Sequence, residues 1–177
     1  MDGYLFFDDI TPETRSALLE LVDDGLLRVA AVTVSGSAAA YAVYDADDVR
    51  TAYATIEAVV SSVGRPSRRI LAVSQPGTPP GRQHPGTRPV PDGSTVVLAL
   101  LPVPLGRASE VANVLTGMAP GAGVATVIGS AGTVLLEVDG TDPVQLQAQV
   151  SSMLTAAGVD IADILITTTA LGRGRAS

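Results

Sequence analysis

Two kinds of hydrophobic pattern alternate along the first part of the chain. Short apolar runs predict β-strands, because the strands of a buried sheet are short and almost continuously apolar. Segments in which apolar residues recur every three or four positions predict amphipathic helices. The predicted strands are Tyr4–Asp8, Val29–Val34, Ala39–Tyr44 and Arg69–Val73.

Two helices are expected between these strands. The first begins after Thr11, since a threonine side chain caps the free N–H groups of a helix, and it ends before Gly25. The second begins after Asp47 or Asp48, and its apolar positions repeat as far as Gly64. The first part of the chain therefore predicts the order β-α-β-β-α-β.

The second part of the chain predicts the same order of elements. Its strands are expected at Val96–Leu101, Gly123–Ile128, Thr133–Val138 and Ile161–Thr168. One helix has its apolar positions between Ala108 and Met118. Another begins after Asp142 and ends before Gly158.

The two parts also resemble each other in sequence, which indicates a tandem duplication. The segment Val34-Ser-Gly-Ser-Ala38 returns as Val127-Ile-Gly-Ser-Ala131 at an offset of 93, and this offset aligns Tyr4–Phe7 with Val97–Leu100. A βαββαβ unit has both helices on one face of its sheet. We therefore predict an α+β fold of two ferredoxin-like repeats, whose open faces pack together as an intramolecular pseudo-dimer of the dimeric α+β barrel type.

Proline and glycine mark the boundary between the repeats. Of the 20 residues at 75–94, ten are Pro or Gly, which excludes a helix or a central strand. We interpret this segment as a linker; a lid over a site and a Pro-rich partner motif are the alternatives. The predicted organisation is a first repeat at 1–74, the linker at 75–94, a second repeat at 95–171 and a disordered tail at 172–177.

Composition narrows the functional classes. The net charge is −7, so neither a nucleic acid nor an anionic membrane is expected as a partner. The absence of cysteine excludes disulfides and thiolate sites, and the single histidine, His84, lies in the linker, where we expect neither a zinc site nor a catalytic triad. No segment predicts a membrane span or a signal peptide. We expect a cytoplasmic protein without a cofactor or a metal.

The two hairpin turns contain the candidate ligand-binding residues. They are Gly36, Ser37, Gly129, Ser130 and Thr133. Turn chemistry alone explains them, because glycine adopts positive φ and hydroxyl groups bond to nearby backbone. The functional alternative is that their N–H groups and hydroxyls contact a small polar ligand at the end of the barrel. No residue is assigned a catalytic role from the sequence.

Several hydrophobic segments of the second repeat form a recognisable series. They are Val96-Val-Leu-Ala-Leu-Leu, Ala108-Ser-Glu-Val-Ala, Gly123-Val-Ala-Thr-Val-Ile-Gly129, Val134-Leu-Leu-Glu-Val138 and Gly158-Val-Asp-Ile-Ala-Asp-Ile-Leu-Ile-Thr-Thr-Thr169. The series resembles the effector-binding (RAM) domain of Lrp/AsnC-type regulators, which belongs to the dimeric α+β barrel group. The resemblance implies that fold and a ligand site near Gly129, and by pseudo-symmetry near Gly36. No helix-turn-helix of the kind found in those regulators is visible, so direct DNA binding is not expected.

Three functions remain open at this point. The first is a stand-alone small-molecule-binding or regulatory module. The second is a cofactor-free enzyme of the cyclase, isomerase or monooxygenase type, acting on a small apolar metabolite inside the barrel through polar groups such as Tyr41, Tyr44, Asp45 or Glu137. The third is a structural or assembly protein that forms homo-oligomers through its sheet edges.

Overall fold

The computed structural model describes residues 1–177 except 75–93, 120, 129–131, 161, 168 and 174–177. The predicted linker, apart from Ser94, lies outside the described residues. We call residues 1–74 the first half and residues 94–173 the second half. The elements of the first half are β1 (Asp2–Phe7), α1 (Pro12–Asp23), β2 (Val29–Val32), β3 (Ala40–Asp45), α2 (Val49–Ser62) and β4 (Arg68–Ser74).

The second half has the same order, with its last strand in two parts. Its elements are β5 (Thr95–Pro102), α3 (Ala108–Met118), β6 (Gly123–Val127), β7 (Thr133–Gly140), α4 (Pro143–Ala156), β8 (Asp163–Thr167) and β9 (Thr169–Arg173). The predicted fold class is confirmed, because both halves are βαββαβ units. One boundary differs: β9 includes residues 172 and 173, which the sequence assigned to the tail, because they pair with β2.

The predicted helix caps are present in three of the four helices. The Thr11 hydroxyl accepts a hydrogen bond from the Thr14 N–H at 3.2 Å, and Asp48 accepts one from the Thr51 N–H at 2.8 Å. Asp142 caps α4 in the same way. These short polar side chains fix the first turn of each helix, because they satisfy donors that have no partner within the helix.

The strands form one nine-stranded sheet in the order β8-β5-β7-β6-β4-β1-β3-β2-β9. The halves meet at two edges: β4 pairs with β6, and β9 pairs with β2. The sheet also closes on itself, because the Val34 N–H donates to the Ile166 carbonyl at 2.7 Å and the Ile166 N–H donates to the Ser35 carbonyl at 2.9 Å. Each contact joins the last strand of one half to the second strand of the other, as an approximate twofold axis requires.

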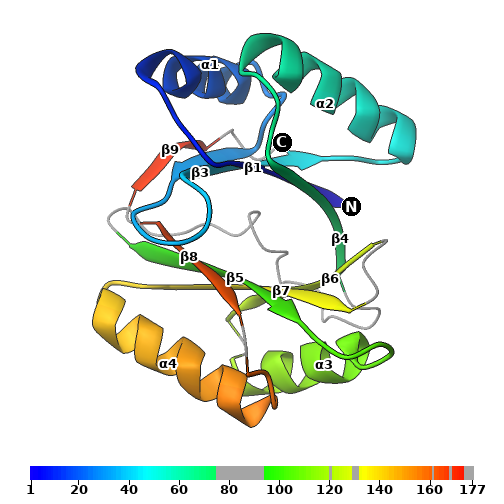
Figure 1. Cartoon of the computed structure of the whole chain (residues 1–177), viewed down its shortest axis with the longest axis vertical. Helices are drawn as coiled ribbons and strands as arrows, with labels where there is room; N and C mark the ends of the chain where they lie inside the picture. Colours follow the sequence, from blue (N-terminus) through cyan, green and yellow to red (C-terminus); the bar gives the residue numbers. More distant parts are fainter. Residues whose placement is uncertain (75–93, 120, 129–131, 161, 168, 174–177) are drawn as a thin grey trace.

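Three hydrophobic clusters fill this architecture. One lies between the first-half strands and helices α1 and α2, and another lies between the second-half strands and helices α3 and α4. The third lies inside the barrel, between the two halves. Figure 1 shows the resulting layers, with the helices of each half on opposite outer sides and the strands between them.

The strand register corrects the alignment between the halves. Tyr4 and Phe6 face the barrel interior, whereas Val97 and Ala99 face helices α3 and α4. The offset of 93 is therefore wrong by one residue, and a shift of one residue exchanges the two faces of a strand. Tyr4 pairs with Val43 in the first half, and Leu98 pairs with Glu137 at the corresponding place in the second half. Equivalent positions in these strands therefore lie 94 residues apart (98 − 4 and 137 − 43).

Candidate functional site

The barrel interior contains an unusual set of buried polar side chains. Tyr4 on β1 is 0% exposed, Tyr41 on β3 is 3% exposed and Glu137 on β7 is 2% exposed. Both tyrosines belong to the interior cluster, and the alternation of side chains along β7 places Glu137 on the same face as interior Leu135. A carboxyl group at this depth is rare in proteins, which makes this region the candidate functional site.

The two walls of the interior differ in chemistry. The first half supplies an aromatic wall, in which the Tyr4 and Phe6 ring centroids are 6.5 Å apart and those of Phe6 and Tyr41 are 6.4 Å apart. The second half supplies an aliphatic wall of Leu98, Leu100, Leu135 and Leu165. A lining with one flat aromatic side suits a planar apolar molecule better than a sugar or a phosphate ester.

Glu137 acts electrostatically on Tyr4. Burial raises the pKa of Tyr4 well above its ordinary value, and the negative charges of Glu137 and Asp2 raise this pKa further. The phenol of Tyr4 therefore keeps its proton at neutral pH and remains a hydrogen-bond donor inside the barrel. The interior thus combines a donor and an acceptor within an apolar cluster.

An ion pair joins the two halves at one end of the barrel. The Arg68 guanidinium donates to the Asp163 carboxylate at 2.8 Å, and the Ser37 hydroxyl donates to the same carboxylate oxygen at 2.6 Å. Arg68 also lies over the ring of Phe6, 5.4 Å from its centroid. Burial tends to raise the pKa of Asp163, but the hydrogen bonds from Ser37 and Arg68 outweigh burial and hold this pKa below its usual value.

The structure places Gly36 and Ser37, two of the predicted ligand-binding residues, at this end of the barrel. Gly36 has a φ of +132°, and an added Cβ would meet Leu165 and the Ile164 carbonyl oxygen, so its turn rests directly on β8. Ser37 is exposed and bonded to Asp163. Thr133 is half-buried at the start of β7.

Gly129 and Ser130 lie outside the described residues. The ligand role predicted for the two hairpin turns stays a prediction, because the described contacts of Gly36 and Ser37 join the two halves of the chain.

The polar groups considered for an enzyme are separated by the fold. Tyr41 and Glu137 face the interior, whereas Tyr44 lies in the cluster beneath helices α1 and α2. Asp45 is largely exposed and forms an ion pair with Arg28, which also bonds to Asp2 at 3.3 Å. Only the first two are therefore placed to contact a molecule inside the barrel.

Sequence reasoning missed one interior residue, Tyr4, which was included in an apolar strand. Strand alternation could have placed Tyr4 and Phe6 on one face, since Leu5 and Phe7 occupy the other. Which face was the interior one could not be decided without the strand register.

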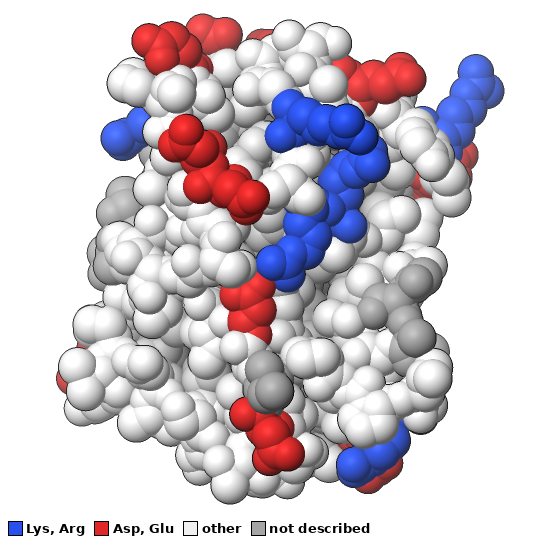
Figure 2. All heavy atoms as spheres, viewed as in Figure 1, with Lys and Arg blue, Asp and Glu red and all other residues white. Residues whose placement is uncertain are grey.

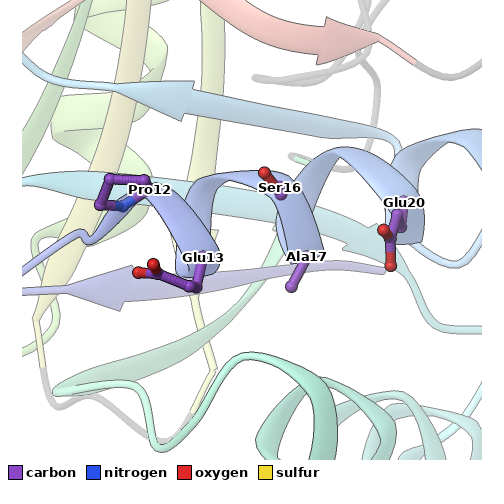
Figure 3. A pocket seen from close by; sticks show the side chains of 5 residues that line it. All are labelled: Pro12, Glu13, Ser16, Ala17 and Glu20. Atoms are coloured by element: carbon purple, nitrogen blue, oxygen red, sulfur yellow. The ribbon is translucent and has the colours of Figure 1, made fainter.

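A surface hollow on α1 is a weaker candidate. It has a volume of about 390 Å³, and the residues that line it are Pro12, Glu13, Ser16, Ala17 and Glu20. Figure 3 shows that Glu13, Ala17 and Glu20 project from the same side of this one helix. Two exposed carboxylates on a single helix are typical of a solvated surface.

The surface charge is mixed in sign. On the face of the molecule drawn in Figure 2, a group of arginines lies on the first half, with acidic side chains beside it. Among the described residues, no group of three or more histidine, cysteine or acidic side chains is arranged to hold a metal ion. Among these same residues, no helix has the length and apolar character needed to cross a bilayer.

Comparisons with known proteins identify the fold. No family model and no curated protein matches the sequence, whereas 11 chains of solved structures match the structure. The siroheme decarboxylase NirDL is 7% identical with a TM-score of 0.63, covering 99% of this chain and 73% of that chain. A candidate monooxygenase of Fusobacterium nucleatum is 12% identical with a TM-score of 0.60, covering 99% and 94%.

An anthrone oxidase-like protein is 11% identical with a TM-score of 0.56 and the same coverage, 99% of this chain and 94% of that chain. At these identities the comparisons concern the fold alone. They agree with the closed arrangement of strands derived above: the chain has the dimeric α+β barrel fold, with both halves in one polypeptide.

Proposed function

We propose that this chain is a stand-alone small-molecule-binding module that holds one planar, largely apolar molecule inside its barrel. The observation that supports this proposal most directly is the buried Glu137 opposite the aromatic wall of Tyr4, Phe6 and Tyr41. The rings provide stacking area, and the carboxylate accepts a hydrogen bond from a hydroxyl or amine of the ligand. The resemblance of the second repeat to the effector-binding domain of Lrp/AsnC-type regulators supports a regulatory role.

The number of sites per barrel follows from the same residues. Glu137 occupies the position that Val43 occupies in the first half, and Leu98 occupies the position of Tyr4. A ligand that needs both an aromatic face and a carboxylate therefore has one orientation and one site in each chain. We expect a binding stoichiometry of one.

The first test uses 2-naphthol as a probe, because it combines a fused-ring surface with one hydroxyl group. A probe concentration of 100 times Kd stabilises the folded state by about 2.7 kcal/mol. For a chain of this size we expect the Tm to rise by about 5–10 °C. Glu137→Gln should weaken binding by about tenfold, because it replaces a charged hydrogen-bond acceptor with a neutral one.

Glu57→Gln is the matched control, since Glu57 is exposed on α2 and lies away from the barrel interior. The control should bind 2-naphthol as the unaltered chain does. Equal Kd values for the unaltered chain and Glu137→Gln would contradict the proposed role of Glu137. The absence of any Tm change up to the solubility limit of the probe would contradict the proposed site itself.

A second candidate function is that of a cofactor-free enzyme. The observation that favours it is that Tyr4 and Glu137, a proton donor and a proton acceptor, are both buried in the interior and interact electrostatically. Structural neighbours described as a candidate monooxygenase and as anthrone oxidase-like agree with this class of chemistry. Oxygen uptake by the chain with anthrone, abolished in Glu137→Gln, would support the enzyme. Binding of anthrone without oxygen uptake would contradict the enzyme and agree with the binding module.

A further inference from the structure

Thr167 adds a further polar group to the barrel interior. Thr167, the last residue of β8, is 2% exposed, and its hydroxyl makes no hydrogen bond to any residue that the structure describes. A buried hydroxyl without a partner is destabilising, because it loses its bonds to water and gains none in return. Valine would fill the same place in a strand without this cost.

The strand register places Thr167 and Glu137 on the same interior wall of the barrel. Thr167 alternates with the interior residue Leu165, so its side chain belongs to the interior face of β8. Thr167 pairs with Val96 on β5, and Glu137 pairs with Leu98 on the same strand. The two residues thus lie on either side of β5 and two residues apart along it, with their Cα atoms separated by roughly 12 Å.

The equivalent position in the first half has no hydroxyl. Ile70 pairs with Tyr4 on β1, and Leu165 pairs with Leu98 at the corresponding place on β5, so Ile70 and Leu165 are equivalent. Two residues further along each strand, the position equivalent to Thr167 is therefore Ala72. The two halves therefore differ at this position as they do at Glu137, and in both cases the polar residue belongs to the second half. Both differences lie on the interior wall that faces Tyr4 and Phe6.

We propose that Thr167 is a second anchor of the barrel site, so that the ligand is a planar fused-ring molecule with two polar substituents at opposite ends. Glu137 accepts a hydrogen bond from a hydroxyl or amine at one end, and the Thr167 hydroxyl bonds a carbonyl or hydroxyl oxygen at the other. This inference rests on the proposed function, and it specifies the class of ligand. It also explains why a costly hydroxyl is present at a position where the strand needs only a β-branched side chain.

The first measurement needs no ligand. Thr167→Val should raise the Tm of the free chain by about 3 °C, because it removes a buried hydroxyl that has no partner. Thr126→Val is the matched control: the Thr126 hydroxyl donates to the Val73 carbonyl at 3.3 Å, so its removal should leave the Tm unchanged or lower it. A lower Tm for Thr167→Val would overturn the proposal, since the hydroxyl would then have a structural role.

The second measurement compares two probes, 2-naphthol and 2,6-naphthalenediol, by isothermal titration calorimetry. The unaltered chain should bind the diol about tenfold more tightly, since the second hydroxyl gains a partner in Thr167. Thr167→Val should remove this preference and leave the Kd for 2-naphthol unchanged, whereas Thr167→Ser should retain it. Equal affinities for the two probes in the unaltered chain would overturn the second anchor and leave the proposed function intact; failure of both probes to bind would overturn the proposed function.

Discussion

Replacing Gly36 with alanine adds one methyl group where the turn between β2 and β3 rests on β8. The added Cβ would lie 2.7 Å from the Ile164 carbonyl oxygen and would also overlap the Leu165 side chain. The first contact involves backbone, so it cannot be relieved by a change of rotamer. The φ of Gly36 is +132°, in a region that side-chain-bearing residues rarely adopt.

The expected cost has two parts. Backbone strain in this region contributes about 1–3 kcal/mol, and overpacking against β8 contributes about 1–3 kcal/mol. We expect Gly36→Ala to lower the free energy of unfolding by about 3–5 kcal/mol, which corresponds to a decrease in Tm of about 10 °C for a chain of this size. The loss arises at the contact between the halves, because Leu165 belongs to the second half.

Gly25 provides a matched control. It has a φ of +75°, but an added Cβ would meet nothing within 4 Å. Gly25→Ala should therefore cost only backbone strain, about 1–2 kcal/mol. Urea unfolding of both variants at one pH gives the comparison, with the midpoint shifted and the slope unchanged. If Gly36→Ala destabilises the chain no more than Gly25→Ala does, the turn does not rest on β8 as described.

Two further predictions concern charged groups. The pKa of Asp163 is lowered in the folded state, so its carboxylate stabilises the fold above the unfolded value near 3.8 and loses this effect as pH falls through the folded value. Asp163→Asn should therefore be less stable than the unaltered chain at pH 7, and the difference should shrink below about pH 4 in urea titrations; a constant difference would contradict the assignment. Asp48→Ala should cost about 1 kcal/mol by removing the cap on α2, whereas Asp47→Ala, beside it, should cost little in the same titrations.

Local signals in the sequence were sufficient for the elements and their order. The caps at Thr11, Asp48 and Asp142 and the glycines after the helices act within a few residues, so they are legible without a structure. The hydrophobic faces of the helices were predicted for the same reason. The duplication then limited the architecture, because two open apolar sheet faces in one chain bury each other.

The strand register and the closing strand could not be predicted in this way. A strand that is buried on both faces is apolar at every position, so its sequence does not show which residues face the helices. This is why the repeat was aligned one residue out of step at Tyr4 and Val97. Ile161–Thr168 was predicted as one strand, and its continuation as β9 depends on pairing with β2, more than 100 residues away.

The candidate site was predicted only in part for a related reason. Glu137 and Tyr41 were recognised as polar groups that a barrel interior could use, but Tyr44 and Asp45 were equally eligible. The distinction depends on which face of β3 and β7 each residue occupies. That the Thr167 hydroxyl has no partner could not be predicted either, because an orphan hydroxyl is defined by its surroundings and not by its neighbours in sequence.

The ion pair between Arg68 and Asp163 indicates what the duplication makes available to this fold. In the strand pairing, Arg68 lies opposite Phe6 on β1 and Asp163 lies opposite Leu100 on β5. Arg68 and Asp163 therefore occupy equivalent positions in the two halves, and they bond to each other. In a dimer of identical subunits such a position would face its own copy, and two like charges would repel. Two halves that vary independently can place opposite charges there. The same independence places Glu137 opposite an aromatic wall that the second half lacks, and this difference between the walls is what the proposed single oriented site requires.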